Sequence, residues 1–316
     1  MAYGIIFQKS ILKEHSAMTL KQLQYAIKVA ETGSVTEAAK SLYIAQPSLT
    51  ASIHELEKEY NINIFTRSNK GIELTGEGDE FLGYARQVIE QTNLIEERYN
   101  GKAPSKQRFC VSSQHYSFVV EAFVELLKEH IGEKYEFHMR ETQTYEIIND
   151  AAHLRSEIGV LYLNRFNETV IKKVIKDNGL VFHTLFVAKP HVFIGKNSPL
   201  AEKEILTLDD LKPYPRLSYE QGSHNSFYFS EEILSVTECD KEIVVCDRAT
   251  LFNLLVGLGG YTICSGVINE ELNGSNIIAR PLDVDDYMEI GYILPSNMRP
   301  SLLTLRYIEI LKKLTK

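Results

Sequence analysis

Residues 33–53 read GSVTEAAKSLYIAQPSLTASI, and this stretch decides the fold of the N-terminal third. Ser34 begins a helix over 35–42, and Glu37 stands at the capping-box spacing, in which each side chain bonds a free backbone N–H of the other residue. A turn over 43–46 follows, and Pro47 lies in the first turn of the next helix, where no N–H is needed. Small and apolar residues around the turn have the spacing of a helix-turn-helix, in which two helices cross closely: Ala39, Leu42, Ile44, Leu49 and Ile53.

The flanking residues extend this motif into a winged helix. Apolar residues at three- and four-residue spacing predict a helix over 19–30, which Thr32 and Gly33 end. The third helix continues through Leu56, and residues 61–75 then alternate with period two around a polar loop, which predicts a small β-hairpin. The prediction for residues 18–76 is therefore a mainly α winged helix-turn-helix domain.

A long helix is predicted over residues 76–99. Its apolar stripe consists of Phe81, Leu82, Ala85, Val88, Ile89, Thr92 and Ile95. A long helix with such a stripe usually pairs with a second helix, which favours a dimerising linker and hinge over 77–107. The alternative is that the stripe packs on the winged domain of its own chain. Gly101 and Pro104 end the helix.

Residues 108–316 alternate strands with helices. This pattern predicts an α/β fold with a parallel sheet and helices on both faces. The segment is long enough for two lobes around a cleft, lobe I over about 108–184 and 280–316 and lobe II over about 187–277. Strands are expected at 109–111, 135–140, 157–162, 185–194, 243–246, 261–264, 277–280 and 288–294, and helices at 117–129, 145–154, 208–211, 250–257 and 302–314.

Taken together in order, several fragments resemble the LysR-type transcriptional regulators. They are MTLKQL (18–23), GSVTEAA (33–39), AQPSLTASI (45–53), FTR (65–67) and LTGEG (74–78). Each fragment alone is weak evidence, but their order and spacing make the resemblance specific. It continues more faintly in NSPLA (197–201) and VGLGG (256–260).

The resemblance implies a winged helix-turn-helix, a dimerising linker helix and a two-lobed effector domain like a periplasmic binding protein. It also implies a homodimer or homotetramer that binds an interrupted palindrome of double-stranded DNA near a promoter. A small polar or anionic co-inducer in the interlobe cleft would modulate this binding. No membrane partner and no enzymatic activity are expected.

The sequence departs from the family pattern at four places. Residues 1–17 precede the usual start, either as an N-terminal extension or because Met18 is the true start. Tyr60-Asn61 replaces the usual Leu-Gly before the wing, where Asn tolerates positive φ. His54 stands at a position that is often basic, which makes a phosphate contact there weaker and pH-sensitive. Cys264-Ser265 replaces Leu-Pro after the glycine-rich segment.

The candidate DNA contacts gather at the start of the third helix and on the wing. Gln can bond adenine through two hydrogen bonds, Ser and Thr can bond several base edges or phosphates, and the Pro47 ring can pack on thymine. Arg67 and Lys70 are expected to hold the DNA backbone from the wing. The full set is Ser34, Thr36, Gln46, Pro47, Ser48, Thr50, Ser52, His54, Arg67 and Lys70. The alternative is that the helix residues are merely solvated and that Arg67 is a surface cation near the linker helix.

Candidate ligand contacts follow predicted strands, because ligands of α/β sheets bind beyond the carboxyl ends of strands and near helix N-termini. They are Ser112, Ser113, Gln114, Thr142, Thr144, Ser218, Tyr219 and Gln221. Simple helix capping is the alternative role for each of them.

Composition limits the other classes of function. Of the 316 residues, 44% are hydrophobic and 24% charged, which is typical of a folded globular protein and excludes intrinsic disorder. The net charge is −8, yet residues 18–107 carry 10 basic and 12 acidic side chains, so the first third is nearly neutral and free to approach a polyanion. No apolar run is long enough to span a membrane, and a cytoplasmic protein with four reduced cysteines is expected.

No metal or cofactor site is predicted. Cys110, Cys239, Cys246 and Cys264 lack metal-ligand spacing, and the glycines of 257–260 precede a strand rather than open a helix. Two other classes stay open: a cytoplasmic small-molecule-binding protein with a vestigial DNA domain, and an enzyme on a two-lobed scaffold. The enzyme would need a titratable pair in the cleft, for which Glu141 and Glu220 are the candidates.

Overall fold

A computed structural model describes residues 18–68, 71–100, 107–130 and 134–315. The chain divides into two compact units, residues 1–102 and 103–316. We call them the first and second unit, and each is described by itself. Within the described ranges, no helix is both long and apolar enough to cross a lipid bilayer.

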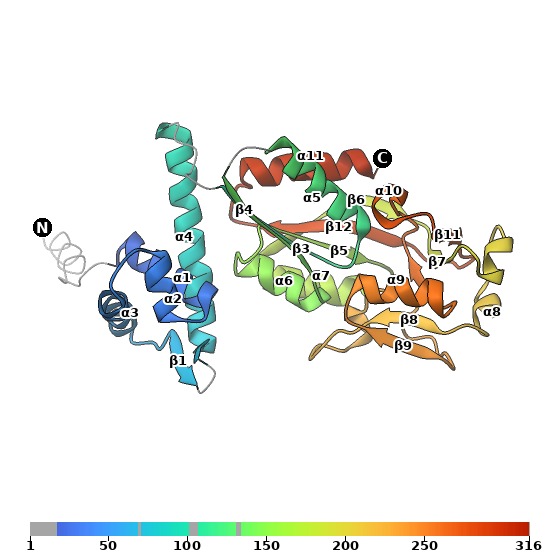
Figure 1. Ribbon diagram of the computed structural model, residues 1–316, viewed down its shortest axis with the longest axis horizontal. Coiled ribbons are helices and arrows are strands. Elements are labelled where there is room, and N and C mark those ends of the chain that lie inside the picture. The colour runs from blue at the N-terminus through green and yellow to red at the C-terminus, as the bar shows by residue number, and fades with distance from the viewer. Residues whose placement is uncertain (1–17, 69–70, 101–106, 131–133, 316) are drawn as a thin grey trace, which may run out of the picture. The chain divides into compact units, whose positions relative to one another are not determined.

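The first unit has the predicted order of helices and hairpin (Figure 1). Gly33 ends the first helix with φ +62°, and Asn61 ends the third with φ +53°, so Asn does adopt the left-handed conformation there. The elements are α1 (Leu20–Thr32), α2 (Val35–Ser41), α3 (Gln46–Tyr60), β1 (Phe65–Ser68), β2 (Gly71–Leu74) and α4 (Gly76–Asn100).

The predicted capping box at Ser34 is only half formed. The Ser34 hydroxyl accepts a bond from the Glu37 N–H at 3.4 Å, but the Glu37 carboxylate bonds Lys40 at 2.8 Å instead of reaching back. A cation one turn later competes successfully for the exposed carboxylate. A complete capping box lies instead at the start of α1, between Thr19 and Gln22.

Helix α4 is anchored in the core of the first unit, which corrects part of the predicted dimer stripe. Leu82 is fully buried and Ala85 is 2% exposed, and α4 packs against α1. Phe81 and Ile89 also pack against this core. The expected alternative, packing on the same chain, therefore holds for these four residues. Val88 and Ile95 are exposed.

The second unit contains two five-stranded sheets. The first lobe holds the sheet with order β4-β3-β5-β12-β6, and the second lobe holds the sheet with order β11-β7-β10-β8-β9. The strands are β3 (Gln107–Ser113), β4 (Tyr135–Glu141), β5 (Ile158–Leu163), β6 (Leu180–Ala188), β7 (His191–Gly195), β8 (Arg216–Tyr219), β9 (Glu242–Val245), β10 (Tyr261–Cys264), β11 (Ile277–Pro281) and β12 (Met288–Pro295).

Both sheets are mixed, whereas the sequence pattern predicted a parallel sheet. Strand β3 is parallel to β4 and β5, but β12 is antiparallel to β5 and β6. The chain crosses between the lobes from β6 to β7 and returns from β11 to β12, and a returning strand runs against its neighbours. The single strand predicted over 185–194 is therefore two strands in two sheets, separated by Lys189 and Pro190.

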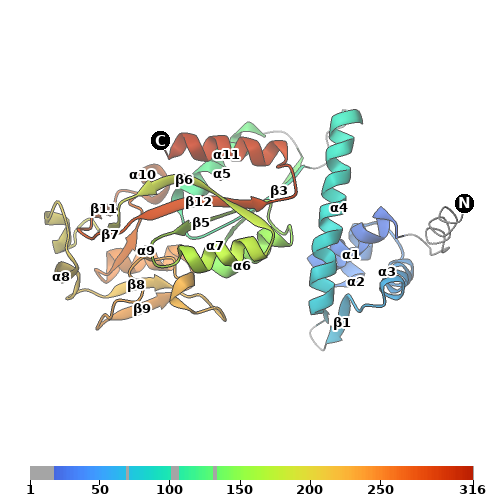
Figure 2. The same cartoon turned by 180° about the vertical axis from the view of Figure 1, so that it is seen from behind.

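Helices cover both faces of the first sheet, as predicted (Figures 1 and 2). Alternate residues of β5 explain this: Ile158, Val160 and Tyr162 belong to the core under α5 (Ser117–Glu129) and α11 (Leu302–Leu314), whereas Leu161 and Leu163 pack with α6 (Thr144–Ala152) and α7 (Glu168–Asp177). Neither α7 nor β8 was expected from the sequence. The remaining helical elements are η1 (Pro199–Glu202), α8 (Leu208–Leu211), η2 (Phe227–Phe229), α9 (Arg248–Gly257) and α10 (Glu270–Asn273).

Candidate functional site

The first turn of α3 presents a polar surface. Gln46, Pro47 and Ser48 are exposed, whereas Leu49 and Ile53 are buried against the helices of the first unit. The N-cap residue, Ala45, has no side chain that could bond the free N–H groups of this turn. The start of α3 therefore combines exposed side-chain donors and acceptors with the positive end of the helix dipole, an arrangement suited to nucleic acid.

Two side chains near this turn have defined internal partners. The Thr36 hydroxyl of α2 donates to the amide oxygen of Gln46 at 3.2 Å, across the turn of the helix-turn-helix. The Thr50 hydroxyl donates to the carbonyl oxygen of Gln46 at 3.0 Å, within its own helix. The hydroxyl proton of Thr50 is thus committed to the backbone, and its methyl group and oxygen lone pairs remain for a partner.

Other predicted contacts have mixed surroundings. Ser34 caps α2 and is half-buried, and Ser52 is half-buried on α3. The His54 ring is 72% exposed, with Nδ1 3.3 Å from the Glu57 carboxylate. An acid in the same helix thus competes with any phosphate for this ring. Arg67 lies in β1, but its side chain and the whole of Lys70 lie outside what the structure describes.

Glu57 has a structural role that the sequence reasoning missed. Its carboxylate accepts the backbone N–H groups of Ile64 at 2.9 Å and Phe65 at 3.2 Å, just where the hairpin β1–β2 begins. The wing is also bonded from the Ile72 N–H to the carbonyl of Gly33. The available signal was an acid one turn before Asn61, the left-handed residue that redirects the chain toward the wing.

The predicted ligand contacts of the second unit are mostly buried and bonded within the protein. The Ser112 hydroxyl is fully buried and bonds Asp150 and Ser156, each at 2.7 Å. This corrects the expectation for Ser112: its hydroxyl is fully buried, donates to Asp150 and bonds within the first lobe. Ser113 is equally buried, and its hydroxyl donates to the carbonyl of Gln114 at 2.7 Å.

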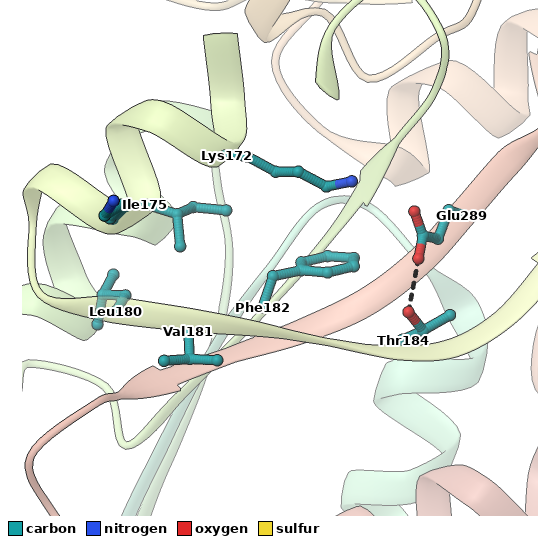
Figure 3. A pocket seen from close by; sticks show the side chains of 8 residues that line it. Lys172, Ile175, Leu180, Val181, Phe182, Thr184 and Glu289 are labelled. Carbon is teal, nitrogen blue, oxygen red and sulfur yellow. Dashed lines mark hydrogen bonds between the residues drawn. The ribbon is translucent and has the colours of Figure 1, made fainter. Parts of the chain in front are cut away.

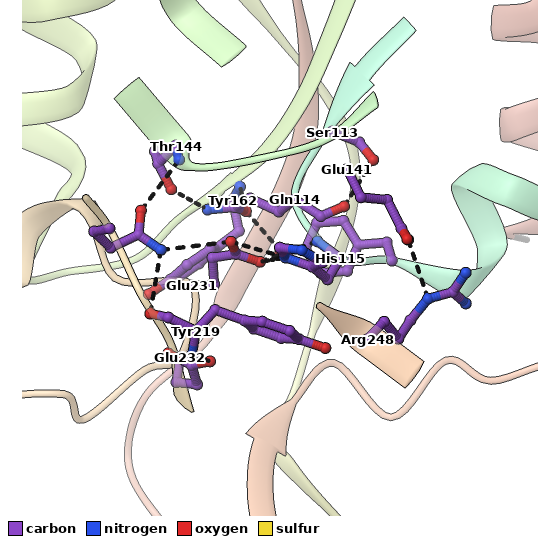
Figure 4. Close-up of polar contacts among 12 residues, drawn as sticks. Ser113, Gln114, His115, Glu141, Thr144, Tyr162, Tyr219, Glu231, Glu232 and Arg248 are labelled. Atoms are coloured by element: carbon purple, nitrogen blue, oxygen red, sulfur yellow. Dashed lines mark hydrogen bonds and ion pairs between the residues drawn. The ribbon is translucent and has the colours of Figure 1, made fainter. Parts of the chain in front are cut away.

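Four predicted ligand residues meet two unpredicted ones between the lobes (Figure 4). The Gln114 amide donates to the Thr144 hydroxyl at 2.6 Å, and the Thr144 N–H donates to the Gln221 side chain at 3.1 Å. The unpredicted residues are His115 and Glu231, whose side chains are each 5% exposed and 2.9 Å apart. We call Gln114, His115, Thr144, Tyr219, Gln221 and Glu231 the interlobe cluster.

Tyr219 closes the interlobe cluster from the second lobe. Its ring stacks on the His115 ring with centroids 3.9 Å apart and planes 6° from parallel. Its backbone N–H donates to Glu232 at 3.0 Å. The remaining predicted residues make contacts outside the cluster: the Thr142 N–H donates to the carbonyl of Ser113, and the Ser218 hydroxyl donates to Glu242.

The charges around the cluster are mainly acidic. Burial lowers the pKa of His115, but the charge and hydrogen bond of Glu231 outweigh it, and the pKa is raised. Burial and the neighbouring Glu231 charge raise the pKa of Glu232 to about 8. Burial also raises the pKa of Glu141, although Arg248 lies 3.1 Å away. Glu141 is thus held by an arginine, and Glu220 is exposed on the second lobe.

A cavity of about 400 Å³ lies elsewhere on the first lobe (Figure 3). Helix α7 and strand β6 form most of its wall, and Glu289 of β12 completes it. None of the predicted ligand contacts lines it. Across the described ranges, no three His, Cys, Asp or Glu side chains are grouped so that they could hold a metal ion.

Three comparisons relate this chain to known proteins. Residues 20–79 match the model of the bacterial regulatory helix-turn-helix proteins of the lysR family. The uncharacterized HTH-type transcriptional regulator YvbU of Bacillus subtilis is 24% identical over 305 residues, which cover 94% of this chain and 99% of that one. ClcR of Pseudomonas putida, another HTH-type transcriptional regulator, is 38% identical over 89 residues, 28% of this chain and 30% of that one.

A solved structure shares the fold. A full-length OxyR variant from Pseudomonas aeruginosa superposes with a TM-score of 0.66 at 18% identity, covering 95% of each chain. The fold likeness thus extends over the residues of both units, whereas the family model covers α1 to β2 and only the first residues of α4. Residues 20–79 of this chain thus form a helix-turn-helix domain of the lysR family of bacterial regulatory proteins.

Proposed function

We propose that the chain recognises a specific DNA sequence with the first turn of α3. The observation that carries this proposal is the exposure of Gln46, Pro47 and Ser48 on a helix whose opposite face is buried. In a helix-turn-helix, this end of the second helix meets base edges in the major groove. Residues 18–76 form the DNA-binding domain in this proposal, 77–107 the linker and 108–316 the effector domain.

A mobility-shift experiment with full-length protein tests the proposal. Genomic fragments upstream of the gene and a random duplex of equal length are compared at several salt concentrations. We expect a preference for one fragment of about a hundredfold or more. Gln46→Ala should remove most of this preference, whereas Gln24→Ala, which removes an exposed Gln from α1, should not. Equal binding of all duplexes by the unmodified protein would overturn the proposal.

Pairing of two chains is proposed to use the exposed side of α4. Tyr84 is 59% exposed, Val88 39% and Ile95 60%, at spacings that place them along one side of the helix. An exposed apolar stripe on a long helix favours pairing with a second copy. Ile95→Lys should convert dimers to monomers in sedimentation velocity and weaken operator binding, because one chain reads only one half-site.

Modulation by a small polar or anionic effector completes the proposal. Its support is the two-lobed second unit, the partial exposure of Tyr219 within the interlobe cluster and that of Thr142 next to it. An effector acts only through its different affinity for two arrangements of the protein. Thermal-shift measurements of the full-length protein with small acids and amino acids test this, and Thr142→Val should abolish any stabilisation found. The relatives are transcriptional regulators, and no catalytic step is part of this proposal.

A further inference from the structure

Three pairs of residues join the two lobes of the second unit, the first of them through the backbone N–H of Thr144. Thr144 meets Gln221, Glu141 meets Arg248, and His115 meets Glu231 (Figure 4). The first pair contains no ionisable side chain. The second pair keeps its arginine charged at every physiological pH. His115 is the member of these pairs with an ordinary pKa near neutrality, about 6.5.

The contacts of His115 depend on the second lobe. Its ring Nδ1 lies 3.0 and 2.9 Å from the two carboxylate oxygens of Glu231, and its backbone N–H donates to the same carboxylate at 3.0 Å. The Tyr219 ring stacks on the His115 ring, with the ring centroids 3.9 Å apart. Tyr219 ends β8 of the second lobe, and Glu231 accepts from Gln221 of that lobe, although Phe229 just before it packs in the core of the first lobe. Opening that carries Glu231 away with Tyr219 would return the histidine ring to water.

Charged groups from several elements face this ring. Glu231 follows η2, Glu141 ends β4, and both favour the protonated form of His115. Arg248, at the start of α9, disfavours the protonated form of His115. The pKa of Asp247 is lowered mainly by its hydrogen bonds to Thr250 and more weakly by the His115 charge. Glu232 and the Tyr219 hydroxyl complete the surroundings, and burial raises the pKa of each.

We propose that His115 and Glu231 form a proton-dependent latch, which holds the two lobes closed while the imidazole is protonated and releases them when it loses its proton. Removing one charge from a buried ion pair is strongly destabilising, and a neutral imidazole would leave the buried Glu231 carboxylate uncompensated. The ligand of this latch is the proton itself. Any effect of the latch on DNA binding rests on the proposed function above, whereas the latch itself does not depend on that function.

The direction of the pH effect follows from the pKa shifts. The pKa of His115 is raised in the closed state, so the latch is fully formed below the ordinary histidine value and is lost as pH rises through the higher closed-state value. Glu232 acts in the same direction, because a carboxyl with its pKa raised to about 8 must lose a buried proton as pH rises. Closing should weaken by up to about tenfold per pH unit for each proton released.

A histidine NMR titration of the full-length protein tests the latch directly. The His115 resonance is assigned with His115→Gln, and its midpoint should lie above the ordinary histidine value. Glu231→Gln keeps a hydrogen-bond acceptor but removes the charge, so the His115 midpoint should fall below that value. His138, 60% exposed on β4, supplies the matched control: its midpoint should not respond to Glu231→Gln. A His115 midpoint at or below the control, or one unchanged by Glu231→Gln, overturns the latch.

Hydrogen exchange measures the opening of the lobes independently. After correction for the intrinsic pH dependence of exchange, amides of β8 and of residues 221–232 should lose protection between pH 6 and 9. His115→Gln should reduce this pH dependence to the part that Glu232 contributes, and His138→Gln should keep it in full. A protection that is equally pH-dependent in His115→Gln contradicts the proposal. Absence of an operator preference would overturn the proposed function but not the latch, because neither the histidine titration nor hydrogen exchange involves DNA.

Discussion

The two units place the same residue types at or near helix starts in opposite surroundings. In the first unit, Gln46 and Ser48 stand exposed on the first turn of α3. In the second unit, Gln114 is fully buried and Thr144 is 1% exposed, and the two bond each other. A polar residue at a helix start is therefore not by itself a sign of ligand binding. Whether it faces solvent or a neighbouring element decides between recognition and structure.

The largest expected effect is a difference in unfolding free energy between alanine substitutions at two glycines of the first unit. A Cβ at Gly78 would lie 2.0 Å from the carbonyl oxygen of Ile64, whereas a Cβ at Gly76 meets nothing within 4 Å. Gly78→Ala should destabilise the first unit by about 3 kcal/mol or more, because the clash involves backbone. Gly76→Ala should stay within about 0.5 kcal/mol. Urea unfolding followed by circular dichroism measures both, and equal stabilities would refute the close contact.

The next effect tests the acid that holds the wing. Glu57→Ala leaves two backbone N–H groups without their acceptor, at a side chain that is 12% exposed. We expect a loss of about 2 to 3 kcal/mol in unfolding free energy. Glu55→Ala, at an exposed position of the same helix, serves as the control and should have little effect. If both variants unfold at the same urea concentration, Glu57 does not support the hairpin.

Two serines, Ser112 in the second unit and Ser48 in the first, allow the units to be compared through the loss of one hydroxyl group. Ser112→Ala removes bonds to Asp150 and Ser156 and should lower the stability of the second unit by about 2 kcal/mol, with DNA binding by folded protein unchanged. Ser48→Ala should do the reverse: operator affinity falls by about tenfold, and stability hardly changes. Thermal unfolding measures the stability of both variants, and mobility shifts measure their operator affinity. The contrast fails if Ser48→Ala is the destabilising one.

The smallest effect concerns the orientation of Gln46. Thr36→Val keeps the shape of the side chain but removes the hydroxyl that bonds the Gln46 amide. Losing one such bond should weaken operator binding by about fivefold and relax the preference at the base pair that Gln46 meets. Thr66→Val, at an exposed position on β1, is a control of the same chemistry. Selection of bound duplexes from a randomised pool would show whether the preference has changed.

The first unit was predictable because its signals are local. Helix starts, the Gly33 and Asn61 ends and the turn before Pro47 depend on residues a few positions apart. What sequence reasoning missed there involves competition and distance: Lys40 takes the Glu37 carboxylate, and Glu57 reaches seven residues ahead to Ile64. The contacts of α4 with α1 depend on tertiary packing, which an apolar stripe alone does not specify.

The second unit was predicted in outline, but its details were missed because they depend on contacts between residues far apart in the sequence. Strand and helix periodicity indicated a two-lobed α/β fold, but strand direction depends on where the chain crosses between lobes. The pairing of His115 with Glu231 joins residues 116 positions apart, and no local pattern specifies such a contact. The sequence reasoning reached the neighbouring Gln114 and Gln221 through their positions near strand ends, but had no signal for the ionisable pair between them.

The two crossings between the lobes also have a consequence for the ancestry and engineering of the molecule. His191 and Pro281, which lie at the two ends of the second sheet's segment, are partners across the β7–β11 pair, and Ala188 and Met288 are partners across β6–β12. The second lobe is thus a cassette inserted into a first lobe whose flanking ends already lie side by side. Its exchange between related proteins would use two splice points where the flanking strands pair, and would have to match the core residues that the two lobes share.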